Sequence, residues 1–395
     1  MSNLNDAGIE KNIRHLHFIG AAYVDGYLWT NALEWNGYYK IDIEDGKTEF
    51  LGLFEYAGIL ADKLFNQVLA YKKYVFFIPW FSDYLVRLDT ETLDMKYWRL
   101  PDSVVFEEAK FRAAYLYNGK IYMFPHCGDD ICIFDIKKEE FRCDKTWVGE
   151  FLKYVEGNKK DKFIQGIQKG PLVLLPNLSG SFFMKYNLDS YEHEMILFPK
   201  SEKKILDIAE YKNNEFLILT ERGNVWKWNP DLNDKEIIYR YDGEIEYPYI
   251  HVFSKESDFY LIPANEKNIK VLSEGKEKAV LYPWGWKLKY KNVGLDSIFS
   301  GYFRQKDKII LYPCKGNMLL KVDVQQRMLL GIAVNEEKRD REKAIGCALS
   351  KTREIVYESG ADISLILNVF TDGKRDNTNA DRTDGSRIWR RMRGV

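Results

Sequence analysis

The sequence predicts an all-β protein built from repeated four-stranded sheets. Three observations support this prediction: two anchor positions recur along most of the chain, alternating apolar and polar residues surround them, and aromatic residues make up 15% of the sequence. Tyr, Phe and Trp favour the pleated, half-buried surface of a sheet. A chain of 395 residues is long enough for two or three domains, but repeat folds reach this length as one unit.

The repeat is defined by two anchors. The first closes a short apolar run, usually on proline, and the second ends an alternating strand 9 to 12 residues later. The pairs are Thr30 and Asp42, Pro79 and Asp89, Pro125 and Asp135, Pro176 and Asn187, Thr220 and Asn229, Pro263 and Ser273, and Pro313 and Asp323. Successive second anchors are 42 to 52 residues apart. Seven copies at this spacing indicate a structural repeat.

A further strand and a tight turn precede each first anchor. Asp25-Gly26 and Asn118-Gly119 suit the positive φ angles of a two-residue hairpin turn. Each unit is therefore predicted to run strand, turn, strand, loop, strand, Asx-type turn, strand. Four antiparallel strands in each of seven repeats are typical of a β-propeller, whose sheets pack around a central channel.

Two regions depart from the repeat. In the insertion of residues 144–163, Trp147, Phe151, Leu152 and Val155 fall on one face of a predicted helix. After the seventh unit, residues 344–358 resemble one more first hairpin, followed by a short predicted helix and a polar, basic end.

We therefore predict seven blades and a short closing extension. The N-terminal lead-in covers residues 1–17, the propeller residues 18–336, and the C-terminal extension residues 337–395. An eight-bladed ring with an incomplete last blade is the alternative.

The repeat resembles those of two known propeller families. An apolar hairpin, a loop and a YDxxT-like third strand resemble kelch repeats, while IDIEDGKTEF and RLDTETLDMKYW look like strands of quinoprotein-type propellers. The resemblance covers residues 18–334 and implies architecture only. The Gly-Gly pair of kelch units is replaced here by PW, PH, PN, TE, PA and PC, so no functional residue is carried over.

Charge and composition narrow the classes of partner and compartment. The chain has 58 basic and 59 acidic residues, so no global field attracts nucleic acid. The sequence has neither a signal-peptide core nor an apolar run long enough to span a membrane, and we expect a cytoplasmic protein. The five cysteines form neither an even framework nor a CxxC pair, so reduced thiols are expected.

Aromatic residues are the first candidate site residues. In a propeller, the loops after the second and fourth strands share the face around the channel mouth. We expect five aromatic residues on that face: Trp35, Trp80, Phe81, Trp284 and Trp286. Such rings stack on a sugar or anchor a partner peptide, or else they fill gaps between blades.

Polar residues of the same loops are the second group: His126, Asp129, Asp130, Glu221 and Arg222. Asp129 and Asp130 also suit ordinary turn chemistry before a strand.

The sequence predicts no metal site and no cofactor. A site built from His126 and Cys127 with Cys132 and Cys143 would need four ligands that converge as a tetrahedron. Burial on neighbouring strands already accounts for Cys132 and Cys143.

The predicted function is that of a non-catalytic binding or scaffold module, which recognises a protein segment or a glycan through an aromatic-lined loop face. The alternative is a carbohydrate-active hydrolase or lyase, which needs two carboxylates placed across a sugar. Its candidates are Glu34, Asp83, Asp130, Glu221 and Glu266. A third hypothesis is a sensor whose basic tail, residues 386–395, contacts another component.

Overall fold

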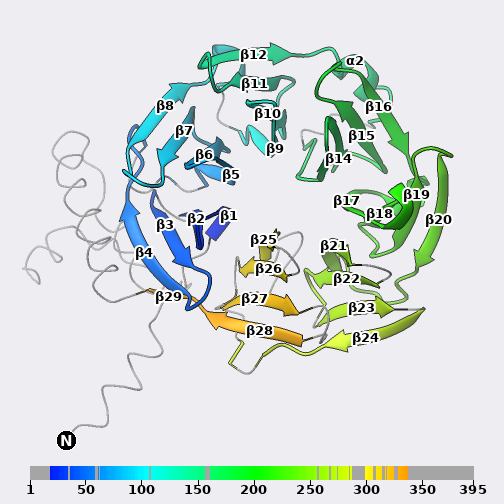
Figure 1. The fold of residues 1–395 in the computed structure, drawn as a ribbon. Coiled ribbons are helices and arrows are strands. Elements are labelled where there is room, and N and C mark those ends of the chain that lie inside the picture. Colours follow the sequence, from blue (N-terminus) through cyan, green and yellow to red (C-terminus); the bar gives the residue numbers. More distant parts are fainter. Residues whose placement is uncertain are drawn as a thin grey trace, which may run out of the picture.

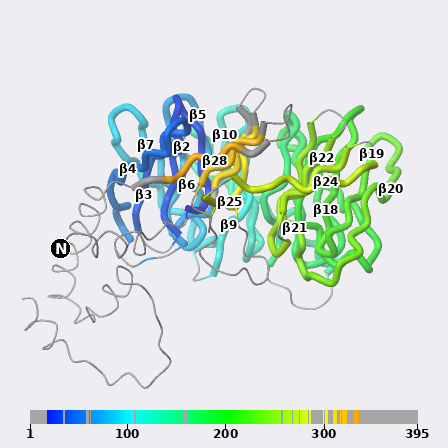
Figure 2. Tube along the Cα trace, turned by 90° about the horizontal axis from the view of Figure 1, so that it is seen from below, coloured from blue at the N-terminus to red at the C-terminus, as the bar shows by residue number. Residues whose placement is uncertain are grey.

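The protein is a seven-bladed β-propeller. Its computed structural model describes residues 18–33, 36–57, 61, 63–105, 108–155, 161–255, 258–266, 268–273, 275–283, 285–286, 299–305, 308–313, 316, 318–323 and 328–336. Seven antiparallel sheets stand around a central axis, with the first strand of each blade innermost and the fourth outermost (Figure 1). Viewed from the side, the blades form a single flat ring (Figure 2).

Each blade is one continuous segment of chain. Blades 1 to 3 comprise β1 (Phe18–Val24), β2 (Tyr27–Ala32), β3 (Tyr38–Asp42) and β4 (Lys47–Gly52); β5 (Phe65–Tyr71), β6 (Tyr74–Pro79), β7 (Tyr84–Asp89) and β8 (Met95–Arg99); and β9 (Phe111–Tyr117), β10 (Lys120–Pro125), β11 (Ile131–Asp135) and β12 (Glu140–Asp144).

Blades 4 to 7 repeat the pattern. They comprise β13 (Ile167–Lys169), β14 (Leu172–Pro176), β15 (Phe182–Asn187) and β16 (His193–Leu197); β17 (Ile205–Glu210), β18 (Phe216–Thr220), β19 (Val225–Asn229) and β20 (Asp234–Tyr239); β21 (Tyr249–Lys255), β22 (Asp258–Pro263), β23 (Ile269–Ser273) and β24 (Lys276–Val280); and β25 (Phe299–Gln305), β26 (Lys308–Pro313), β27 (Met318–Asp323) and β28 (Met328–Ala333).

The ring closes between blades 7 and 1. After β28, the short strand β29 (Asn335–Glu336) pairs in parallel with the outer strand β4, and it lies beside β4 in Figure 1. Tyr23 of blade 1 stacks on Phe303 of blade 7, with ring centroids 5.4 Å apart. The end of the last blade is thus fastened to the first by backbone bonds and by apolar packing.

The apolar core is divided among the blade junctions. The buried residues described form seven clusters, one between each pair of neighbouring blades. The cause is the alternation of side chains along a strand, which sends successive residues to opposite faces of the sheet. Both faces of every blade are therefore covered by a neighbour, and the strands are correspondingly apolar.

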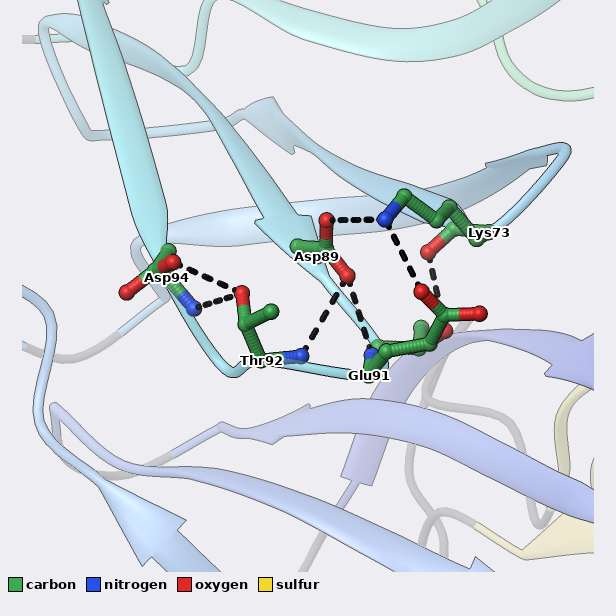
Figure 3. A network of polar contacts seen from close by, with 6 residues as sticks. Lys73, Asp89, Glu91, Thr92 and Asp94 are labelled. Atoms are coloured by element: carbon green, nitrogen blue, oxygen red, sulfur yellow. Dashed lines mark hydrogen bonds and ion pairs between the residues drawn. The ribbon is translucent and has the colours of Figure 1, made fainter.

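The outer turns follow one design, which Figure 3 shows for blade 2. Asp89 Oδ1 accepts hydrogen bonds from the N–H groups of Glu91 and Thr92, at 3.0 and 3.3 Å. Lys73 Nζ lies 3.0 Å from Asp89 Oδ2. The same bonds, to the second and third following residues, recur at Asp42, Asp135, Asn187 and Asn229. The predicted Asx-type turn is confirmed in these five blades.

The inner strands share a second repeated feature. In six blades a β-bulge interrupts the pairing near the start of the first strand, at Gly20, Asn66, Arg112, Leu206, Ile250 and Ser300. Gly20 has φ of 64°, and a Cβ there would lie 2.6 Å from Asn66 O, so this bulge requires glycine. The bulge changes the direction of one side chain at the end of the strand that faces the loops.

Both predicted hairpin turns and part of the predicted helix are confirmed. Asp25-Gly26 and Asn118-Gly119 all have positive φ. In the insertion, α2 is a single turn (Val148–Phe151) that buries Trp147 and Phe151. Leu152 is 60% exposed, unlike Trp147 and Phe151, so the buried side of this turn does not include it.

Among the described residues, the other helical segments are 3₁₀ turns at Asp102–Val104, Lys200–Glu202 and Lys212–Asn214. Within the described part of the chain, no helix has the length and apolarity needed to cross a membrane. The predicted lead-in (1–17) and the closing hairpin, helix and basic tail (337–395) lie outside the described residues.

Candidate binding face at blades 2 to 4

A series of backbone hydrogen bonds ties the loops of blades 2, 3 and 4 together. Lys110 N–H donates to Trp80 O (2.8 Å), His126 N–H to Lys110 O (2.7 Å), Lys162 N–H to His126 O (2.8 Å), and Leu178 N–H to Lys162 O (3.0 Å). We call these five residues the belt. Trp80, His126 and Leu178 follow the second strands of their blades, and the two lysines immediately precede Phe111 and Phe163. The belt therefore fixes three loops relative to one another.

Two buried lysines each hold one of these loops through contacts of their ammonium groups. We call these two sets of contacts the clamps. The side chain of Lys110 is 1% exposed, and its Nζ lies 3.0 Å from Asp83 Oδ1 and 3.2 Å from Phe81 O. Lys162 Nζ likewise bonds to Asp129 Oδ1, at 3.0 Å, and to Gly128 O. A buried ammonium group needs a charged or hydrogen-bonding partner. Each lysine thus holds the loop of the preceding blade in place.

An aromatic and cationic group lies beside the clamp of blade 2. Phe81 is 40% exposed, and its ring centroid lies 5.4 Å from that of Trp80, at an interplanar angle of 54°. The guanidinium carbon of Arg112, the bulge residue of β9, lies 5.6 Å from the centre of the Trp80 ring. Arg112 thus contributes a cation–π contact to Trp80. We call Trp80, Phe81 and Arg112 the anchor group.

The pKa of His126 on this face is shifted by its surroundings. It is buried, with Nε2 3.2 Å from Asp161 Oδ1 and Nδ1 3.4 Å from Phe163 O. Burial and the nearby charge of Arg112 lower the pKa of His126 to about 4, although Asp161 acts in the opposite direction. The imidazole is therefore neutral at pH 7.

The predicted aromatic set is only partly gathered. Trp80 and Phe81 lie side by side as expected, but Trp286 stacks on Tyr282 and Phe299, at 4.9 and 5.5 Å, in the junction of blades 6 and 7. For Trp286 the gap-filling alternative is correct. Trp35 and Trp284 lie outside the described residues.

The predicted polar residues divide by exposure. Asp129 is accessible but bound to Lys162, while Asp130 is buried and pairs through Oδ2 with Lys145, at 3.2 Å. Glu221 is buried in blade 5 beside Lys203 and Lys204, and the neighbouring Arg222 is exposed. His126, Asp129 and Asp130 all come from the loop of blade 3, and of these three only Asp129 is exposed.

The carboxylates proposed for an enzyme have separate partners. Asp83 is held by Lys110, Asp130 by Lys145, and Glu221 by two lysines. Glu266 accepts a hydrogen bond from the Tyr241 hydroxyl at 2.7 Å. Glu34 lies outside the described residues. Each of the four described carboxylates therefore has its own lysine or tyrosine partner, in a different blade of the ring.

The two strand cysteines form a pair of their own. Cys132 and Cys143 are opposite each other on β11 and β12, with Sγ atoms 3.8 Å apart. A hydrogen bond from the Cys132 thiol lowers the pKa of Cys143 to about 7. Neither takes part in the one group of three or more His, Cys, Asp or Glu donors that the described residues bring together, which consists of His126, Cys127 and Asp161.

Sequence reasoning missed Lys110, Arg112, Asp161 and Lys162. A signal was available, because AKF and DKF place a lysine directly before the first strand of successive units. Such a lysine, next to a buried phenylalanine and repeated at the same position, is typical of a structural role rather than of a solvated surface. The pairing of Asp161 with His126 had no comparable signal, since it depends on how blades 3 and 4 meet.

Comparisons with known proteins agree with the fold. No family model and no curated protein sequence matches the chain. Among solved structures, a catalytically inactive virginiamycin B lyase from Staphylococcus aureus with quinupristin is similar at a TM-score of 0.57 and 13% identity, over 78% of this chain and 94% of that one.

Two further solved structures are similar in fold. The Pan2 WD40 domain of Neurospora crassa has a TM-score of 0.50 and 9% identity, over 78% of this chain and 90% of that one. The extracellular domain of a proposed hybrid two-component system of B. thetaiotaomicron has a TM-score of 0.53 and 9% identity, over 77% of this chain and 38% of that one. Identities this low show a shared fold alone.

Proposed function

We propose that the protein is a binding module that recognises a protein segment through the loop face of blades 2 to 4. The observation that carries the proposal is the anchor group. Phe81 is exposed next to Trp80 on loops held by the belt and by two buried lysines. Aromatic and arginine side chains on a rigid support are the usual hot spots of protein interfaces, and a preformed surface avoids the entropic cost of ordering.

The geometry favours a protein segment over a glycan. A sugar needs a flat, open ring face to stack on. Here Arg112 lies against the Trp80 ring, and the planes of Trp80 and Phe81 are tilted by 54°. The pair therefore offers an apolar ridge suited to a side chain, not a flat platform.

Charge around the ridge suggests the kind of segment. Three carboxylates on this face, Asp83, Asp129 and Asp161, are well exposed, whereas the lysines that hold two of them are buried. This face thus offers three accessible carboxylates as hydrogen-bond acceptors. A segment with an apolar residue next to lysine, arginine or backbone N–H donors would fit this surface.

The carbohydrate-active enzyme is less well supported. Glycoside hydrolysis uses two carboxylates that act on the same sugar. The described candidates are each committed to a different lysine or tyrosine, in blades 2, 3, 5 and 6.

Peptide and glycan arrays probed with the purified chain test the proposal. We expect binding to peptides that combine an apolar and a basic residue, and a loss of at least tenfold in affinity for Phe81→Ala. Leu232→Ala is the matched control, because Leu232 is an exposed apolar residue in an outer turn. Binding to glycans alone, or equal affinity for the two variants, would contradict the proposal.

A further inference from the structure

Three potential metal ligands converge at the junction of blades 3 and 4. His126 and Cys127 follow β10, and Asp161 precedes the first strand of blade 4. One ring nitrogen, the Cys127 sulfur and one Asp161 carboxylate oxygen all lie within 4.8 Å of one another. His126 and Cys127 are buried, while the Asp161 side chain is 64% exposed. The group therefore joins an enclosed nitrogen and sulfur to an oxygen at the surface.

The backbone holds the two segments in register. Lys162 N–H donates to His126 O at 2.8 Å, and Phe163 N–H donates to Pro125 O at 3.3 Å. On the other side, His126 N–H and Cys127 N–H donate to Lys110 O and Ala109 O, at 2.7 and 3.0 Å. The ligand residues thus stand on a support that is fixed independently of any bound ion, which is what a specific site requires.

The contacts of the His126 ring point to a cation. Nδ1 faces Phe163 O at 3.4 Å, and Nε2 faces Asp161 Oδ1 at 3.2 Å, so both ring nitrogens face acceptor oxygens. A neutral imidazole has only one N–H, so it can donate in only one of these two contacts. If Nδ1 donates to Phe163 O, then the lone pair of Nε2 faces a carboxylate oxygen. A cation between those two atoms removes the repulsion.

We propose that His126 Nε2, Cys127 Sγ and an Asp161 carboxylate oxygen bind a divalent transition metal of the zinc class. One imidazole, one thiolate and one carboxylate are all ligands that zinc accepts. A ligating histidine commonly donates its other N–H to a backbone carbonyl, which is the role that Phe163 O takes here. Three protein ligands leave a fourth position for water or another ligand.

Charge and space are compatible with this assignment. A thiolate and a carboxylate neutralise a divalent ion, and the thiol proton is released on binding. The nearby Lys162 ammonium bonds to Asp129 and to Gly128 O, so it has partners outside the site. Zinc–ligand bonds are about 2.0 to 2.3 Å long, so the donors must draw together. The exposed side chain of Asp161 has room to make that adjustment.

The test is a titration of the chelator-treated full chain with cobalt(II), followed by absorption spectroscopy and by displacement with zinc(II). This proposal does not depend on the proposed function. We expect one cobalt ion per chain, with a sulfur-to-cobalt charge-transfer band in the near ultraviolet. The Cys127→Ser variant should lose that band, and Asp161→Asn should bind cobalt at least tenfold more weakly.

Two control variants lie in blade 3 but outside the proposed site. Cys143→Ser removes a thiol of β12, and Glu140→Gln removes an exposed carboxylate of the same strand; both should bind cobalt like the parent chain. Since Cys127 is buried, its variant is first checked by circular dichroism, and the exposed Asp161 provides a readout that does not depend on that check. A charge-transfer band that survives Cys127→Ser would overturn the assignment, as would weak binding that is equal in all variants.

Discussion

In five blades, one Asp or Asn side chain accepts two backbone N–H groups to form the turn between the third and fourth strands. The loops after the second strands of blades 2, 3 and 4 instead differ in sequence once they have passed the shared proline: they read WFSD, HCGD and NLSG. The outer turns close a hairpin with local bonds, whereas the loops of blades 2 and 3 are held by Lys110 and Lys162, which precede the next blade. The comparison indicates that the repeated turns make the ring uniform, whereas the loops on one face differ in sequence from blade to blade.

The largest loss of folding stability is expected from a change in the insertion that packs between blades 3 and 4. Trp147 of the insertion is buried between blades 3 and 4, with ring centroids 5.2 and 5.1 Å from those of Phe151 and Phe163. Trp147→Ala should lower the free energy of unfolding by about 3 to 5 kcal/mol, because a large buried side chain leaves a cavity. Urea unfolding measures this. Leu152→Ala, in the same insertion but exposed, should change little; equal losses would show that the insertion does not support the junction.

A smaller loss of folding stability is expected from removing one of the two lysine clamps. Asp83→Asn takes the carboxylate from the buried ammonium group of Lys110 and should lower the free energy of unfolding by about 1 to 3 kcal/mol. Asp102→Asn is the control, since the pair of Asp102 with Arg99 is exposed and such pairs contribute little. Urea unfolding of the two variants side by side gives the comparison. A clamp variant as stable as the surface variant would contradict the role assigned to Lys110.

The smallest loss of folding stability is expected from a change in an outer turn. The N–H groups of Lys138 and Lys137 donate to Asp135 and hold the pKa of its carboxyl below the ordinary value. A carboxyl with a lowered pKa in the folded state stabilises the protein above its unfolded pKa of about 3.9, and this stabilisation is lost as the pH falls through the lower folded value.

Asp135→Asn tests that turn without breaking it, because Asn187 and Asn229 make the same bonds. We expect a small loss of stability at pH 7 that narrows below pH of about 4, measured by urea unfolding at several pH values. A difference that stays constant across this range would mean that the carboxylate charge contributes nothing to the turn.

The architecture could be predicted because its causes are local. Alternating strands, the Asx residues of the outer turns and the Asp-Gly and Asn-Gly hairpins all act within a few residues, and each is confirmed in the described residues. The candidate site was predicted less well. His126, Trp80 and Phe81 lie in the linked loops of blades 2 and 3, but Trp286 fills a blade junction, and Asp130 and Glu221 are buried against lysines.

The sequence by itself determined a propeller of four-stranded blades, because each blade is encoded by local patterns repeated along one continuous segment. It left seven and eight blades open, and the pairing of β29 with β4 closes the ring at seven. Tertiary structure alone decided which loop residues meet. Asp161 faces His126, Lys110 binds Asp83, and Arg112 lies against Trp80, and each of these pairs spans two blades. The physical reason is that contacts across a blade junction depend on how two sheets pack, which no short stretch of sequence specifies.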